Sequence, residues 1–298
     1  HNEERWIEQC LKSIFNQRYK NFEIIIVDNK STDNTLKILK KYKIKKIINI
    51  NNYLPGKSLN LGINQSRGEY IVCISAHCIP TNNLWLSNLV SAIESDGSLA
   101  GVYGRQQPMS FTSPSDKRDL MIVFGLDKKI QKKDSFFHNA NSIIKRECWE
   151  IKQFDNETTN IEDRIWAQEM INLKKFVYYE PEASVYHFHG IHQNNNNVRL
   201  SNIVKIVEDK YEGFTSGKLE PTEKKICAII PLRGTTNIIN MISLLSFTIN
   251  SIKKSKFIDE IIISTDNKST AKLAKSLGAK VPFLRDKKYS NEDVSIEE

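Results

Sequence analysis

Short apolar runs alternate with helix-like segments at the start of the chain, and this alternation constrains the fold more than any other feature. Three runs rich in β-branched residues lie at 21–29, 44–50 and 69–75, and the segments between them carry apolar residues at helical spacing. A short, continuously apolar run bounded by polar residues is typical of a strand buried in a parallel sheet. The alternation therefore predicts an α/β fold with a doubly wound parallel sheet.

The pentapeptide DNKST occurs twice, at residues 28–32 and 266–270. Both copies follow three consecutive isoleucines and lead into a segment of helical pattern. One residue separates the isoleucines from Asp28, whereas two separate them from Asp266. Side chains alternate in direction along a strand, so the two aspartates need not point alike. Asp266 is therefore as readily interpreted as a helix-capping turn residue as a ligand-binding one.

A polar tract divides the chain into two parts. Residues 213–225, GFTSGKLEPTEKK, have the composition of a linker, and a new apolar run begins at Ile226. We place the boundary near 215–224, which predicts one domain at 1–215 and a second, partial domain at 224–298. A chain of 298 residues is long enough for two domains.

The net charge of +8 has two explanations. A basic chain suits an anionic partner, such as nucleotide phosphates or an anionic membrane face. The lysines are nevertheless dispersed, and a residue usage rich in lysine, isoleucine and asparagine explains the charge as well. No nucleic-acid-binding motif is present, so we expect no nucleic-acid partner and at most a peripheral contact with an anionic membrane.

Cysteine usage and hydropathy bear on location. The five cysteines are scattered, and Cys73 and Cys78 lack CxxC spacing, so neither a disulfide framework nor a zinc site is indicated. No apolar run approaches the roughly 18–20 residues of a membrane span. We expect a cytoplasmic protein, at the inner face of the membrane where it contacts lipid.

Five segments of the first part resemble, in order, landmarks of the family 2 glycosyltransferases. They are NEERWIEQCLKSIFNQRYKNFEIIIVDNKSTDNT, GEYIVCISAHCIPTNNLWL, NANSIIKRECW, IEDRIWAQ and YEPEASVYHFHG. Residues 102–108, VYGRQQP, are similar to a segment of rhamnosyltransferase-like members near the acceptor side. The resemblance covers residues 1–192 and implies a Rossmann-like nucleotide-diphospho-sugar transferase fold of GT-A type. The family's first strand should precede His1 and is missing from this sequence.

The resemblance implies a donor site at the ends of the predicted strands. It assigns Asp28, at the end of the second family strand, to a hydrogen bond with the pyrimidine ring of the donor. The alternative is that Asp28 only caps the following helix, although Ser31, Thr32 and Asp33 already offer caps. Further candidates for contact with the donor are Lys57, which is equally readable as a surface lysine, Asn60 and Ser75.

The resemblance also implies a metal position, and here the sequence departs furthest from the family. Ser75 and His77 occupy the acidic positions of the family's DxD motif. Imidazole can bind Mn²⁺, but neutral serine is a poor ligand. His187 and His189 alternate onto one face of a strand and would have to help. We expect Mn²⁺ or Mg²⁺ to bind only together with a nucleotide diphosphate. The alternative is that His77 hydrogen-bonds the phosphate directly.

Two adjacent carboxylates, Glu162 and Asp163, stand at the start of a predicted helix. A helix N-terminus keeps carboxylates ionised, which suits a general base. The resemblance implies that Asp163 deprotonates the acceptor hydroxyl, which attacks the anomeric carbon in line and inverts it. Glu162 is also readable as an acidic residue that only caps the helix.

The second part resembles the start of the acylneuraminate cytidylyltransferases, which make CMP-activated sugars. The resemblance rests on KKICAIIPLRG, SFTINSIKKSKFIDEIIISTDN and KSLGAKVPFLRDKKYS. The family's glycine- and lysine-containing phosphate loop is several residues short here and retains Arg233 as a candidate phosphate contact. The acidic metal site of that family would lie beyond Glu298, so we expect no catalysis from this part alone.

The leading prediction is an inverting glycosyltransferase of bacterial surface polysaccharide synthesis. It would move a hexose or deoxyhexose from a nucleotide-diphosphate donor to a saccharide or lipid-linked acceptor. Two alternatives stay open. One is a catalytically silent nucleotide-sugar-binding module, suggested by the lost DxD acids. The other is a CTP-dependent bifunctional protein related to CMP-sugar synthetases, against which the shortened phosphate loop argues.

Overall fold

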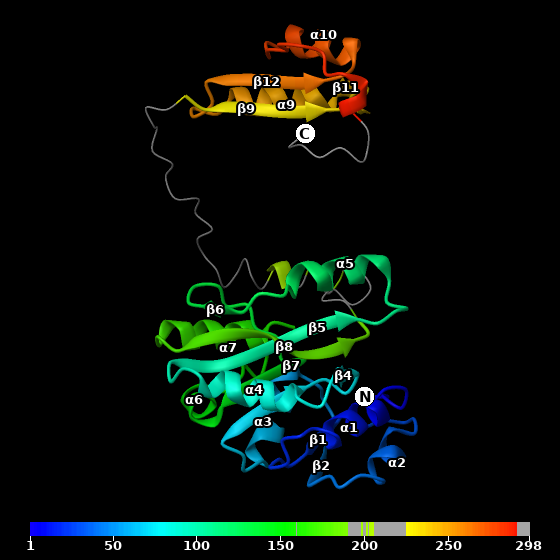
Figure 1. Cartoon of the computed structure of the whole chain (residues 1–298), viewed down its shortest axis with the longest axis vertical. Coiled ribbons are helices and arrows are strands. Elements are labelled where there is room, and N and C mark those ends of the chain that lie inside the picture. The colour runs from blue at the N-terminus through cyan, green and yellow to red at the C-terminus, as the bar shows by residue number, and fades with distance from the viewer. Residues whose placement is uncertain (159, 190–197, 199–200, 202, 206–224, 291–298) are drawn as a thin grey trace. The chain divides into compact units, whose positions relative to one another are not determined.

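The computed structural model describes residues 1–158, 160–189, 198, 201, 203–205 and 225–290. The chain forms two compact units, His1–Tyr211 and Glu212–Glu298 (Figure 1). The linker predicted at 215–224, and with it the predicted end of the first domain, lies outside the described residues. Each unit is described by itself below.

A mixed six-stranded sheet forms the centre of the first unit (Figure 1). The strand order is β3-β7-β5-β8-β4, and β6 pairs with β8 at its side. Strands β5 and β8 pair in parallel, whereas the other pairs of this sheet are antiparallel. The prediction of a parallel sheet was therefore wrong for this sheet, because β7 enters between β3 and β5 in the opposite direction. The strands are β3 (Tyr70–Ile74), β4 (Cys78–Pro80), β5 (Leu99–Pro108), β6 (Lys129–Gln131), β7 (Asn141–Lys145) and β8 (Phe176–His187).

The first two predicted strands form a smaller parallel sheet of their own. Strand β1 (Ile25–Asp28) pairs with β2 (Lys46–Asn49), and Asp28 lies opposite Asn49 at the carboxyl end. The third predicted run is β3 of the larger sheet. Among the described residues, β1 and β3 do not pair. The helices around these strands are α1 (Ile7–Phe15), α2 (Thr35–Leu39) and α3 (Pro55–Asn64).

Apolar side chains cover both faces of the large sheet, as an α/β fold requires. Along β3, Ile71 and Cys73 belong to one buried cluster, with side chains from α5, α6 and α7. The alternate residues Tyr70, Val72 and Ile74 pack against a second cluster, which is built on α1 and α4. The predicted α/β class is confirmed. The remaining helices of this unit are α4 (Trp85–Glu94), α5 (Pro114–Val123), α6 (Arg146–Ile151) and α7 (Glu162–Asn172).

The second unit is a small βα structure. Strands β9 (Cys227–Leu232) and β12 (Glu260–Thr265) pair in parallel, and α9 (Leu244–Lys253) and α10 (Lys268–Ser276) supply buried side chains that pack on one face of the pair. Two isolated parallel bridges, Ile262 to Lys280 and Thr265 to Leu284, continue the pairing on the other side of β12. The smaller elements are the hairpin β10 (Ile238–Ile239) and β11 (Ile242–Ser243), and the 3-10 helix η1 (Lys287–Tyr289).

Candidate functional site

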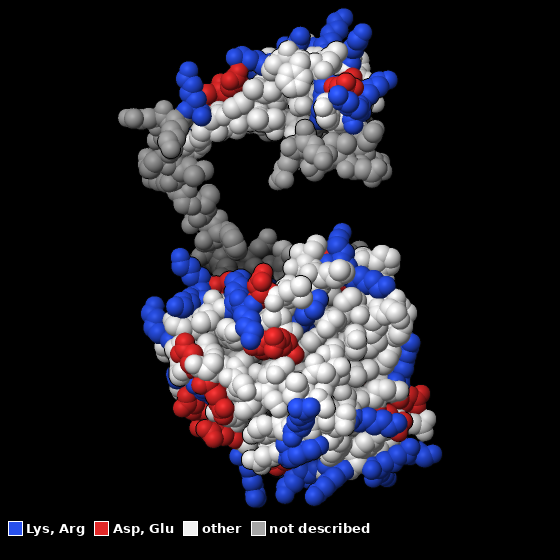
Figure 2. Space-filling view, in the orientation of Figure 1, with Lys and Arg blue, Asp and Glu red and all other residues white. Residues whose placement is uncertain are grey.

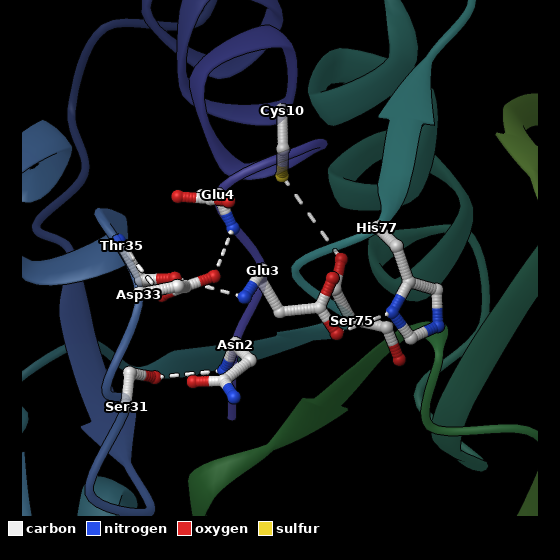
Figure 3. A network of polar contacts seen from close by, with 9 residues as sticks. All are labelled: Asn2, Glu3, Glu4, Cys10, Ser31, Asp33, Thr35, Ser75 and His77. Carbon is white, nitrogen blue, oxygen red and sulfur yellow. Dashed lines mark hydrogen bonds and ion pairs between the residues drawn. The ribbon is translucent and has the colours of Figure 1, made fainter.

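The first residues of the chain lie along the turn that follows β1 (Figure 3). The backbone N–H of Asn2 donates to Ser31 Oγ at 2.9 Å, and that of Glu3 donates to Thr35 Oγ1 at 2.8 Å. Hydroxyl and amide groups of the DNKST turn thus fix the N-terminal segment in place. The segment and the turn together form one side of a polar region at the carboxyl ends of β1 and β3.

Asp28 lies at the base of this region and is 3% exposed. Its Oδ2 accepts from the backbone N–H of Ser31 at 2.8 Å, and its Oδ1 accepts from Ser31 Oγ at 2.5 Å. The carboxylate therefore closes the turn after β1, whereas the first N–H of α2, that of Thr35, donates to Asp33 and not to Asp28. Each carboxylate oxygen has a second lone pair, so these contacts leave capacity for a further donor.

Three of the predicted site residues are histidines, and their rings meet. The rings of His77 and His187 stack with centroids 5.1 Å apart and planes 7° apart, and His189 meets His77 edge-on at 5.3 Å. The antiparallel pairing of β4 with the end of β8 places Cys78 opposite His187, which brings the preceding residue, His77, to this position. Two of the rings have partners at Nδ1: Glu3 Oε1 lies 2.8 Å from His77, and Gln106 Oε1 lies 2.7 Å from His187.

These rings do not fit a divalent cation as they stand. Imidazole lone pairs lie in the ring plane, and the nearly parallel, stacked planes of His77 and His187 cannot aim two of them at one ion about 2 Å from each nitrogen. Among the described residues, no group of three or more His, Cys, Asp or Glu side chains is placed to hold a metal. The predicted Mn²⁺ or Mg²⁺ that binds with a nucleotide diphosphate stays a prediction.

Asp163 and Glu162 begin α7 and are both buried, at 8% and 6% exposure. Asp163 Oδ2 accepts from the backbone N–H of Asn139 at 3.1 Å, and its Oδ1 accepts from that of Arg164 at 2.8 Å. Burial raises the pKa of Asp163 above its ordinary value, and the nearby charge of His138 and these two N–H groups oppose the rise. Burial thus outweighs the groups that favour the ionised form, and the predicted role of Asp163 as a base stays a prediction.

The two carboxylates lie close to the end of β3. The pKa of the Cys73 thiol is raised to about 12, mainly by burial and further by the charges of Glu162 and Asp163. One residue past the end of β3, the backbone N–H of Ser75 donates to the carbonyl of Ala140 at 3.2 Å, next to the N–H that binds Asp163. The segment 139–140 thus connects the Ser75–His77 turn with the first turn of α7.

Two other predicted donor contacts lie on α3. Lys57 is exposed. The Asn60 amide is 4% exposed and is used within the protein: its Nδ2 donates to the carbonyl of Phe154 at 2.8 Å, and its Oδ1 accepts from Trp149 Nε1 at 2.9 Å. The nearby Gly56 approaches the same loop so closely that a Cβ there would lie 1.9 Å from the carbonyl oxygen of Asp155. Asn60 therefore anchors α3, and we leave it out of the proposed donor site.

Comparison with known families explains the arrangement of the first unit. Residues 1–151, half of the chain, match the model of the family described as glycosyl transferase family 2. The chain belongs to glycosyltransferase family 2. Residues 237–298 match the model of the family described as cytidylyltransferase, so both resemblances read from the sequence are confirmed.

Two curated relatives of this family 2 chain cover different shares of it. A dolichyl N-acetyl-alpha-D-glucosaminyl phosphate 3-beta-D-2,3-diacetamido-2,3-dideoxy-beta-D-glucuronosyltransferase of Methanococcus voltae is 35% identical over 114 residues, 35% of this chain and 36% of that protein. The poly(ribitol-phosphate) beta-glucosyltransferase of Bacillus spizizenii is 29% identical over 251 residues, 77% of this chain and 38% of that protein. The matched segments thus span little more than a third of these relatives.

Solved structures share the fold of this family 2 chain at low identity. The mannosyltransferase PcManGT of Pyrobaculum calidifontis, in complex with GDP-Man and Mn²⁺, gives a TM-score of 0.54 at 19% identity, over 70% of this chain and 62% of that one. S. aureus TarS 1-349 in complex with UDP-GlcNAc gives 0.52 at 18% identity, over 70% and 64% of the two chains. The predicted GT-A type of fold is confirmed. No helix in the described ranges has the length and apolarity to cross a membrane.

In the second unit, the DNKST segment binds another loop instead of only its own turn. Asp266 Oδ1 accepts from the backbone N–H of Gly234 at 2.8 Å, and Thr270 Oγ1 donates to the Gly234 carbonyl at 2.8 Å. The Gly234 N–H is the main reason that the pKa of Asp266 lies below its ordinary value. Asp266 therefore holds the loop after β9, which carries Arg233. In the first DNKST segment Asp28 binds its own turn, whereas in the second Asp266 and Thr270 bind Gly234 in the loop after β9.

The sequence analysis missed three residues next to the predicted site: Glu3 contacts His77, Gln106 contacts His187, and His138 lies near Asp163. Glu3 and Gln106 are joined to histidines that lie 74 and 81 residues away in sequence, and no local pattern reveals such a pair. His138 directly precedes the NANSIIKRECW landmark, so its position beside that segment was the one available signal.

Proposed function

We propose that this chain transfers a sugar from a nucleotide-diphosphate donor to an acceptor hydroxyl, with inversion at the anomeric carbon. The observation that carries the proposal is one continuous polar region at the strand ends. Contacts lead from Asp28 through Ser31, Asn2 and Glu3 to His77. From the same turn, Ser75 and the segment 139–140 lead to Asp163. A donor reader, a diphosphate contact and a base are the parts that such a transfer requires.

Asp163 is the base in this proposal. Its raised pKa makes the ionised carboxylate a stronger proton acceptor than an ordinary aspartate, and two backbone N–H groups fix its direction. The acceptor oxygen, relieved of its proton, attacks the anomeric carbon on the face opposite the leaving diphosphate. Glu162, buried beside Asp163, contributes negative charge near the same helix start.

The donor contacts are Asp28 for the base of the nucleotide, and His77 with Ser75 for the diphosphate. Exposed Lys57 stays a predicted phosphate contact, and Arg233 stays a predicted phosphate contact of the second unit only. The neighbouring structures carry GDP-Man in one case and UDP-GlcNAc in the other, so the nucleotide has to be found by testing both.

Relatives support a role in bacterial surface polysaccharide synthesis, with a saccharide or lipid-linked acceptor. The Bacillus relative and TarS of Staphylococcus aureus are named as transferases to poly(ribitol-phosphate), so that polymer is the first acceptor to test. The assay measures UDP released from UDP-glucose or UDP-N-acetylglucosamine, with and without the polymer. Release that depends on the polymer and is lost in Asp163→Asn supports the proposal. Donor binding without any transfer would favour the alternative of a catalytically silent binding module. The poor fit of the histidine rings to a metal ion supports that alternative.

The match of residues 237–298 to the cytidylyltransferase model keeps the bifunctional alternative in view. Incubation with CTP and N-acetylneuraminate tests it directly. Formation of the CMP-sugar and diphosphate would assign a nucleotidyl-transfer activity to the second unit. We expect none from this chain, because the phosphate loop retains Arg233 but lacks the family's further glycines and lysine.

The predicted cytoplasmic location and peripheral membrane contact remain part of the proposal. The cations visible in Figure 2 are spread over both units rather than gathered in one block. Apolar side chains are exposed on α5 and the loop after it: Met121 by 65%, Ile122 by 73% and Leu126 by 72%. Exposed Lys128 and Lys129 follow after Asp127; they pair with Glu180 and Asp134 at 3.0 and 3.8 Å and would have to exchange these partners for lipid phosphate. Co-sedimentation with phosphatidylglycerol vesicles, lost in Ile122→Asp, tests this; unchanged sedimentation of that variant would contradict it.

A further inference from the structure

A carboxylate from the N-terminal segment pairs with the histidine at the family's metal position. Glu3 Oε1 lies 2.8 Å from His77 Nδ1, and the two side chains are 20% and 18% exposed (Figure 3). Glu3 lies 74 residues before His77, so the pair joins the start of the chain to the turn between β3 and β4. A carboxylate–imidazole contact on an exposed surface would contribute little, but this one is mostly shielded from water.

The backbone of Glu3 is fixed from both sides. Its N–H donates to Thr35 Oγ1 at 2.8 Å, and its carbonyl accepts from the N–H groups of Trp6 and Ile7, both at 2.9 Å. The carbonyl thus already binds the backbone at the start of α1. Its side chain is therefore directed at His77 by a rigid backbone rather than held there by the pair alone.

The contact determines which nitrogen of His77 is left for another partner. An ionised carboxylate can only accept hydrogen bonds, so Nδ1 carries the hydrogen and donates to Glu3. Nε2 is then the nitrogen that faces away from Glu3. Pairing of a histidine with a carboxylate fixes both the tautomer and the ring orientation. The stacked ring of His187 and the edge-on ring of His189 further restrict how His77 can tilt.

We propose that Glu3 is a positioning residue that holds His77 with Nε2 directed to the donor diphosphate. The inference rests on the proposed function, and Glu3 acts through His77 without touching the donor itself. The turn position that the family fills with acids is occupied by Ser75 and His77 here. The missing carboxylate is thus supplied from outside the turn, by the segment that precedes α1.

The first test reads the tautomer of His77 by long-range ¹H–¹⁵N correlation spectroscopy of the full chain. The sequence has six histidines, so His77→Gln identifies the signal. We expect the pattern of an Nδ1–H tautomer in the unchanged protein. Glu3→Ala should lose that pattern, and Glu3→Gln should keep it, because the amide oxygen can still accept. An unchanged pattern in Glu3→Ala would overturn the proposal, and so would loss of the pattern in Glu3→Gln.

The second test measures binding of UDP and GDP by calorimetry, and Glu4→Ala is its matched control. Glu4 is the next residue, and its Oε2 accepts from the backbone N–H and the side-chain Nδ2 of Asn34 at 2.9 and 2.8 Å. Its loss loosens the same segment without touching His77. We expect Glu3→Ala to weaken binding by about three- to tenfold, the loss of one positioned hydrogen bond, and Glu4→Ala to leave it within twofold.

The two tests separate the failure of this inference from failure of the proposed function. If the unchanged protein binds neither UDP nor GDP, the proposed function is contradicted and the diphosphate role of His77 with it, whatever its tautomer. If the unchanged protein binds and Glu3→Ala matches Glu4→Ala, only the role of Glu3 is contradicted. Thermal unfolding of both variants, expected at similar temperatures, excludes a general loss of structure as the cause.

Discussion

The backbone N–H of Asn139 donates to Asp163 Oδ2 over 3.1 Å and so ties the amino end of β7 to the first turn of α7. Its neighbour, Ala140, accepts from the N–H of Ser75, which follows β3. Two adjacent peptide groups therefore connect the proposed base with the turn that carries His77. Because β7 lies between β3 and β5, its entry point is fixed by hydrogen bonds on both edges. The base is thus bound by the turn that leads directly into β7.

The first prediction concerns Asp163. Asp163→Asn should lower kcat by about 10²–10⁴ and leave donor affinity nearly unchanged, because the amide cannot take the acceptor proton. Initial rates and calorimetry of the same preparation measure the two effects. Asp116 is a matched control, since it is also buried near a helix start but lies on α5. Equal losses in Asp163→Asn and Asp116→Asn would contradict a specific role.

The raised pKa of Asp163 gives this prediction a pH dependence. A base must be ionised, so transfer should fall as the pH drops through a pKa that lies above the ordinary 3.8. The sign for stability is opposite. Because the folded-state pKa of Asp163 is raised, the protonated carboxyl favours the folded chain. This stabilisation is fully present below pH 3.8 and is lost as the pH rises through the folded-state pKa. The acid-side loss of activity should therefore appear without unfolding caused by this residue, which circular dichroism at each pH checks.

The second prediction concerns Asp28 and separates its two interpretations. Asp28→Ala should weaken UDP binding by about ten- to a hundredfold if the carboxylate accepts from the pyrimidine ring. Ser31→Ala removes the hydroxyl that donates to Asp28 Oδ1 while leaving the carboxylate in place. The backbone N–H of residue 31 still donates to Asp28 Oδ2, whereas the N–H of Asn2 loses Ser31 Oγ as its acceptor. A large loss in Asp28→Ala with a small loss in Ser31→Ala supports base reading; similar losses in both variants would reduce Asp28 to a turn residue.

The sequence predicted well what depends on neighbouring residues. The apolar runs located β1, β2 and β3. The rings of His187 and His189 lie 6.2 Å apart, but β8 ends at His187, so strand alternation does not explain the position of His189. The sequence did not predict features that depend on contacts between distant segments of the chain. The antiparallel entry of β7 depends on pairing with both β3 and β5, which no local pattern encodes. The contact between Glu3 and His77 likewise needs the tertiary fold.

The third prediction concerns Asn60, where sequence and structure lead to different roles. Asn60→Ala should lower the free energy of unfolding by about 1–3 kcal/mol, because the indole N–H of Trp149 and the backbone of Phe154 lose a buried partner. Urea unfolding measures this. UDP affinity should stay unchanged in the folded variant. Lys57→Ala, on the same helix but exposed, should change stability by no more than about 0.5 kcal/mol. Weaker UDP binding in a stable Asn60→Ala would restore Asn60 to the donor site.

The last prediction concerns the metal. The ring planes of His77 and His187 do not converge, so Mn²⁺ alone should not bind the nucleotide-free protein at micromolar concentration. With UDP present, diphosphate oxygens supply the charged ligands that neutral imidazoles lack, and binding should become measurable by calorimetry. This joint binding should weaken in acid, because a protonated imidazole cannot ligate a metal. His77→Gln should abolish it.

Two results would contradict this account of the metal. Tight Mn²⁺ binding without UDP would mean that the rings rearrange into a site of their own. Full transfer activity in excess EDTA would mean that no divalent ion takes part, and that His77 meets the diphosphate directly. In that second case the contact between Glu3 and His77 gains in importance, because it fixes the orientation of the ring that faces the diphosphate.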